Sequence, residues 1–129
     1  MSADEITLVL PRSREFHRVA HLVLGGLAVR LDLTFESLED LQLALGGLLG
    51  GTEATGEVTV RLRVAGDTIH AIVGPFAPDA LQRRLDWDRG SDVSLRRLLD
   101  TVVDQVEIAE AEDGHWVEVT KTVSRVVVQ

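Results

Sequence analysis

Apolar and polar side chains alternate strictly from Glu57 to Val64, and this pattern constrains the fold more than any other stretch of the chain. Strict alternation is typical of a strand with one buried face and one face in water. The residues Ala65–Asp67 then turn the chain into a second apolar run, Thr68–Val73. The sequence therefore predicts an antiparallel hairpin within a sheet that keeps one face solvated.

Three further stretches carry apolar residues at the spacing of an amphipathic helix. They are Arg14–Leu33, the stretch that follows Thr34, and Asp92–Asp104. Thr34 is a suitable N-cap, because its hydroxyl oxygen can accept a hydrogen bond from the first turn. A last hairpin is expected to turn at Glu112–Gly114 into Trp116–Val123.

The order of these elements is strand, two helices, hairpin, helix and hairpin, and it predicts an α+β protein. We expect a two-layer α/β sandwich, in which helices cover one face of a mostly antiparallel sheet. The length of 129 residues, of which 45% are hydrophobic, suits a single domain that spans residues 1–129.

Charge and composition exclude several classes of function. The formal charge of −8 opposes binding to nucleic acid, because such binding depends on clusters of Lys and Arg. The chain contains no cysteine, which excludes disulfides and thiolate metal sites. The N-terminus lacks a signal pattern, and no apolar run reaches the roughly 20 residues that span a bilayer. We therefore expect a cytoplasmic protein that binds neither nucleic acid nor membrane.

The histidines are weak site candidates. His17 and His21 are four residues apart, a spacing that lets two helical side chains share a metal ion. No acid or third histidine is spaced to complete such a site, so a solvated polar stripe is favoured and no metal is expected. His70 and His115 lie in expected strands, and neither has the Ser and Asp neighbours of a catalytic triad.

A glycine-rich run, Gly46–Gly51, closes the second expected helix. It lacks the preceding strand and the following Lys and Ser or Thr of a Walker-type phosphate loop. The favoured interpretation is a helix that ends early, with Gly50 or Gly51 as a left-handed cap and Thr52–Gly56 as a flexible connector.

The stretch Asp40–Gly51 resembles the nucleotide-binding helix of the histidine-kinase-like ATPases, specifically of their small anti-sigma-factor serine-kinase branch. The resemblance continues along most of the chain in the family's order. Ile6–Leu10 resembles the family's first strand, and Ser94–Glu107 resembles its "GLxLLRALVDEVE" helix and exit. The resemblance implies the fold of a histidine kinase-like ATPase domain.

The chain departs from this family at the places where nucleotide would bind. The family's Glu serves as general base and its Asn helps to hold magnesium, and the matching positions here are Gly47 and Gly51. Gly74 stands where the family has the Asp that reads adenine. Asp92 and Ser94 stand at the Gly-x-Gly-Leu segment that touches the phosphates. A helix N-terminus favours anions, so Asp92 would already place a negative charge at that site.

These departures predict a pseudoenzyme. We expect no catalytic residue, no enzyme activity and no bound ATP, magnesium or other cofactor.

The segment Phe76–Gly90 takes the place of the family's ATP lid. Trp and Arg are over-represented at binding hot spots, so this segment is a candidate partner surface. Its residues are Arg83, Arg84, Trp87 and Arg89. The alternative is that apolar side chains of the segment fold back and fill the vacated pocket. Those side chains are Phe76, Leu81, Leu85 and Trp87, and both interpretations can hold together.

The resemblance and the missing residues together predict a catalytically inactive, anti-sigma-factor-like module that regulates transcription by binding protein, without ATP hydrolysis. The expected partner is a sigma factor, an anti-anti-sigma antagonist or a related regulator, and a homodimer is possible because this branch often forms one. One alternative is a divergent but active ATP-dependent serine kinase, in which Asp40 or Glu53 replaces the lost base. Another is a small-molecule sensor that uses the vacated pocket.

Overall fold

The computed structural model describes residues 4–50, 56–86 and 95–126. In chain order the elements are β1 (Asp4–Pro11), a 3-10 turn η1 (Arg14–Phe16), α1 (His17–Arg30), α2 (Phe35–Gly50), β2 (Glu57–Ala65), β3 (Thr68–Phe76), α3 (Pro78–Asp86), α4 (Leu95–Val102), β4 (Gln105–Ala111) and β5 (Gly114–Thr122).

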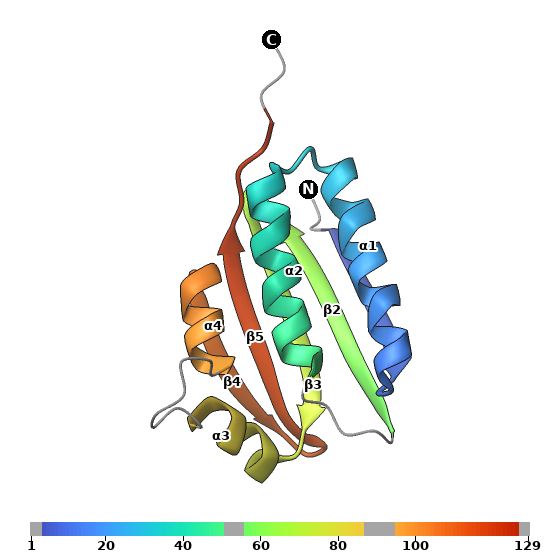
Figure 1. Ribbon diagram of the computed structural model, residues 1–129, viewed down its shortest axis with the longest axis vertical. Helices are drawn as coiled ribbons and strands as arrows, with labels where there is room; N and C mark the ends of the chain where they lie inside the picture. Colours follow the sequence, from blue (N-terminus) through green and yellow to red (C-terminus); the bar gives the residue numbers. More distant parts are fainter. Residues whose placement is uncertain (1–3, 51–55, 87–94, 127–129) are drawn as a thin grey trace.

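The strands form one sheet in the order β1-β2-β3-β5-β4, and every neighbouring pair is antiparallel. Figure 1 shows the helices on one face of this sheet, with α1 and α2 side by side above it. The other face has no described helix over it. The predicted α+β two-layer sandwich is therefore confirmed.

The alternation in β2 places its apolar side chains under the helices. Val58 and Val60 are fully buried, whereas Arg61 and Arg63 between the apolar positions point to the open face. The register continues this division across the sheet, because Val60 pairs with Val73 of β3. The predicted hairpin is confirmed, and its buried face forms the floor of the hydrophobic core.

The first helix is shorter than the sequence predicts. It begins at His17 after the turn η1 and ends at Arg30 rather than at Leu33. Asp32 takes a left-handed conformation with a φ of 55°, and the Leu33 amide donates to the carbonyl of Ala28. This hydrogen bond closes the helix and directs the chain into α2.

The helix α2 continues through the glycine-rich run and ends at Gly50, which agrees with the predicted end if Gly51 follows as the cap. Gly50 is helical rather than a left-handed cap, and Gly51 lies outside the described residues. Each helical glycine costs about 1 kcal/mol relative to alanine. Leu48 and Leu49 are 0% exposed, and burying one such side chain returns about 2 kcal/mol, so burial keeps the last turns helical.

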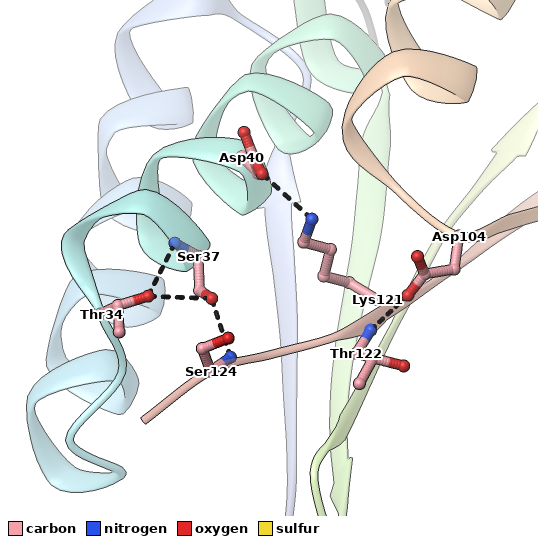
Figure 2. Close-up of polar contacts among 7 residues, drawn as sticks. All are labelled: Thr34, Ser37, Asp40, Asp104, Lys121, Thr122 and Ser124. Atoms are coloured by element: carbon pink, nitrogen blue, oxygen red, sulfur yellow. Dashed lines mark hydrogen bonds and ion pairs between the residues drawn. The ribbon is translucent and has the colours of Figure 1, made fainter. Parts of the chain in front are cut away.

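Thr34 caps α2 as predicted, and the same threonine helps to fasten the end of the chain. The Ser37 amide donates to the Thr34 hydroxyl oxygen over 3.2 Å, and the Ser37 hydroxyl accepts from the Ser124 amide over 2.9 Å (Figure 2). The Thr34 amide donates in turn to the Ser124 carbonyl. These bonds hold the segment after β5 against the start of α2.

The third expected helix, Asp92–Asp104, is observed as α4 over Leu95–Val102. The part before Leu95 lies outside the described residues. Among the described segments, none of the helices combines the length and the apolar character needed to cross a membrane.

Candidate functional site

Gly47, which the resemblance matches with the family's general base, lies where α2 meets α4. A Cβ atom at Gly47 would lie 2.6 Å from Cδ2 of Leu98 and 3.3 Å from Cδ1 of Leu95. The apolar face of α4 therefore packs directly on this side of α2, and Leu95 and Leu99 of α4 are buried. A larger residue at position 47 requires Leu98 to move, which its flexible end permits.

Gly74, which the resemblance matches with the family's adenine contact, lies under an aromatic ring. A Cβ atom at Gly74 would lie 2.6 Å from Cδ2, 2.8 Å from Cε3 and 2.9 Å from Cγ of Trp116. The Trp116 indole N–H donates to the Asp113 carboxylate over 2.9 Å, so this hydrogen bond helps to hold the ring in place. A side chain at position 74 would have to displace the indole.

These two positions lie on opposite sides of the sheet. Trp116 alternates with the buried Val117 along β5, so its ring is on the open face. Gly74 pairs with Thr59, which also belongs to the open face. Gly47 instead faces α4 in the helical layer. The structure therefore does not bring Gly47 and Gly74 into one pocket.

The remaining predicted nucleotide positions are Gly51, Asp92 and Ser94, and all three lie outside the described residues. The same holds for Glu53, one of the two candidate replacement bases.

The other candidate base, Asp40, is engaged in an ion pair. Its carboxylate lies 3.0 Å from Nζ of Lys121 on β5, and the two side chains are 30% and 16% exposed (Figure 2). Asp40 precedes Gly47 by two helical turns, or about 10 Å along the axis. The carboxylate therefore joins α2 to the sheet and lies away from the position of the family's base.

The lid segment includes a helix, α3, that contributes to the core. Phe76, Leu81 and Leu85 are 5%, 1% and 7% exposed, so their predicted burial is confirmed. Trp87 lies outside the described residues.

The candidate partner surface stays a prediction. Trp87 and Arg89 lie outside the described residues, and the side chains of Arg83 and Arg84 are likewise not described.

The helical histidines do not face each other across a metal site. His21 contacts Gln42 of α2 through Nδ1 and the amide oxygen, and the Gln42 amide donates back to the His21 carbonyl over 3.0 Å. His17 lies 3.3 Å from the carbonyl oxygen of Arg12. These contacts fasten α1 to its surroundings.

The strand histidines lie beside carboxylates. His70 is 3.3 Å from Glu118 and His115 is 3.8 Å from Glu110.

Sequence reasoning missed two contacts, Gly74 with Trp116 and Asp40 with Lys121. The signal for the second contact was that Lys121 is the single lysine of the chain. No local pattern indicated the first, because strand pairing alone brings the two residues together.

Comparisons with known proteins identify relatives along nearly the whole chain. No protein-family model matches. The serine-protein kinase RsbW of Listeria monocytogenes is 26% identical over 94% of this chain and 88% of its own length. The serine-protein kinase RsbW of Bacillus velezensis is 27% identical over 93% of this chain and 86% of its own length.

A solved structure shares the fold. It contains the RsbU and RsbW domains of Rv1364c from Mycobacterium tuberculosis, and the match has a TM-score of 0.68 at 15% identity. The match covers 97% of this chain but 35% of the solved one, so it concerns one part of a longer protein.

These comparisons correct one expectation. The prediction that the chain is not an enzyme is wrong, because the relatives that align with 94% and 93% of it are named serine-protein kinases. That prediction depended only on the motif residues that this chain lacks, and the similarity along the rest of the chain was not weighed.

Proposed function

We propose that this chain, which belongs to the anti-sigma serine-kinase branch of the histidine-kinase-like ATPases, controls transcription by binding a sigma factor or the antagonist of one. The observation that carries the proposal is the alignment with RsbW over 94% of the chain. The match of the fold to a structure that contains an RsbW domain supports it. The chain is thus an anti-sigma-factor-like regulator, and its partner is a protein.

We infer further that this binding does not require ATP. Glycine stands at the two positions where the family resemblance implies a base and an adenine contact, and Leu98 and Trp116 lie against them. Because the relatives are named serine-protein kinases, phosphorylation of the antagonist should be assayed on serine. Partner binding and phosphate transfer are therefore measured separately.

In a transcription assay, RNA polymerase is loaded in turn with each sigma factor of the source organism, and the purified chain is titrated in. We expect transcripts that depend on one sigma factor to disappear near equimolar chain, while the other transcripts persist. Addition of the matching antagonist should restore them. Incubation of that antagonist with the chain and labelled Mg-ATP then reports phosphate transfer. Undiminished transcription with every sigma factor, together with no binding to any antagonist, would reject the proposal.

A homodimer, which the family resemblance implies, is part of the proposal. Light scattering on the purified chain should give a mass near twice the 14.1 kDa of one chain. A mass of one chain at micromolar concentration would reject the homodimer, but it would not affect the proposal that the chain binds a partner protein.

A further inference from the structure

The outer surface of α1 and α2 carries apolar side chains in water. A Cβ atom added at Gly25 would lie 4.0 Å from Nε2 of Gln42, and one added at Gly46 would lie 3.6 Å from Cε1 of His21, so small residues line the seam between the two helices. Figure 1 shows these helices as the outer layer of the molecule. The exposed apolar residues beside the seam and at its end are Leu22, Val29, Phe35 and Leu43, which we call the α1–α2 apolar face.

The exposure of this face is large for apolar side chains. Leu22 and Val29 of α1 are 68% and 78% exposed, and Phe35 at the start of α2 is 78% exposed. Single exposed apolar residues are common on protein surfaces, but several on two adjacent helices mark an interaction site. Leu22 and Val29 are two helical turns apart, or about 10 Å, which matches the spacing of anchors on a bound helix.

The charge around this face is mostly negative, although the exposed Arg18 lies one helical turn before Leu22. Asp32, Glu36 and Glu39 are exposed, and none of their carboxylates has an ion pair among the residues that the structure describes. The nearby Arg30 lies 3.7 Å from Asp4, which offsets its charge. An acidic rim next to an apolar face favours a basic partner over a second copy of this chain, because two copies would oppose like charges.

We propose that the α1–α2 apolar face binds a basic amphipathic helix of the partner protein. Apolar side chains of that helix lie on Leu22, Val29 and Leu43, and its Lys and Arg side chains lie beside Glu36 and Glu39. This inference rests on the proposed function insofar as it assumes a protein partner. It adds the surface and the chemistry of what is bound.

The probe is a synthetic peptide of about 18 residues, which makes five helical turns, with Leu at helical spacing and Lys elsewhere. A matched peptide carries Glu at every Lys position. Fluorescence anisotropy of the labelled peptides measures binding to the full chain. The lysine peptide should bind, and the glutamate peptide should bind at least about tenfold more weakly.

Two double variants test the face itself. Leu22→Gln with Val29→Gln removes apolar anchors, and Glu36→Lys with Glu39→Lys reverses the rim. Each should weaken binding of the lysine peptide by about tenfold or more. The controls are Val9→Gln, at a 55% exposed position on β1, and Glu107→Lys, at an exposed position on β4. Both controls should leave the affinity within about twofold, and thermal melts should show that all variants are folded.

Three results overturn the inference: no binding of the lysine peptide, equal binding of both peptides, or equal weakening by the control variants. Conversion of a dimer to a monomer by Leu22→Gln with Val29→Gln also overturns it, because the face would then join two copies of this chain. Full sigma-factor inhibition by that double variant rejects the inference and leaves the proposed function standing. A wild-type chain that binds the peptide on this face, but no sigma factor or antagonist, rejects the proposed function alone.

Discussion

Replacement of Gly74 by alanine should lower the free energy of unfolding by about 2 to 3 kcal/mol, the upper range for overpacking a well-filled site. The added Cβ would lie 2.6 Å from Cδ2 and 2.9 Å from Cγ of Trp116. These atoms belong to the base of the indole rather than to a flexible end, and the indole N–H is hydrogen-bonded to Asp113. The ring must therefore move as a whole. Urea unfolding followed by circular dichroism measures the loss.

Two further variants separate this steric effect from the general effect of adding a methyl group to glycine. Gly26 lies inside α1 with no atom within 4 Å of an added Cβ, so Gly26→Ala should raise stability by up to about 1 kcal/mol. Adding Gly74→Ala to Trp116→Ala should cost less than about 0.5 kcal/mol, because the clashing ring is gone. An equal cost of Gly74→Ala with and without Trp116 would contradict the contact.

Removal of the Asp40 carboxylate should also destabilise the chain strongly. Asp40→Ala leaves the ammonium of Lys121 at the junction of α2 and β5, where that side chain is 16% exposed. Loss of one partner of a fully buried pair costs about 3 to 5 kcal/mol. Since the Asp40 side chain is 30% exposed, water offsets part of this cost, and we expect a loss of about 2 kcal/mol.

A double variant tests whether the lost ion pair causes this destabilisation. Lys121→Met with Asp40→Leu removes both charges and keeps the volume, so it should cost less than Asp40→Ala alone. Arg96 and Asp100 of α4 provide the matched exposed pair, with side chains 49% and 58% exposed. Asp100→Ala should cost at most about 0.5 kcal/mol. Equal losses from Asp40→Ala and Asp100→Ala would show that burial does not strengthen the Asp40 pair.

Local patterns predicted the strands well. The alternation in Glu57–Val64 located β2 to within one residue of its observed end at Ala65. A strand that is buried on one face can hardly shift by one residue, because every apolar side chain would then enter water. The sequence pattern and the packing therefore indicate the same boundaries.

The end of α2 was predicted to within one residue, but helix propensity alone does not explain why the last turns are helical. Glycine next to glycine indicates a helix end when only the preceding turns are considered. In the folded protein Leu48 and Leu49 of α2 are completely buried, and their burial outweighs the low helix propensity of Gly46 and Gly47. Such a tertiary contribution is invisible to a window of sequence.

The candidate site was only partly predictable for a similar reason. Asp40 and Lys121 are 81 positions apart, so their contact depends on the path of the whole chain. The motif comparison located Gly47 and Gly74 as altered positions, but it did not indicate that they face opposite sides of the sheet. The similarity to the serine-protein kinases RsbW was predictable because order and spacing along most of the chain survive even where individual motif residues do not.

Isothermal titration calorimetry of the purified chain shows whether it binds a sigma factor or an antagonist without nucleotide. Each sigma factor and antagonist of the source organism is titrated into the chain, once without nucleotide and once with Mg-ATP. We predict saturable binding of at least one of these proteins without nucleotide, with an affinity that Mg-ATP changes by less than about threefold, or under 1 kcal/mol. Absence of binding to all of them, or binding that occurs only with Mg-ATP, would show that the chain is not an ATP-independent anti-sigma-factor-like regulator.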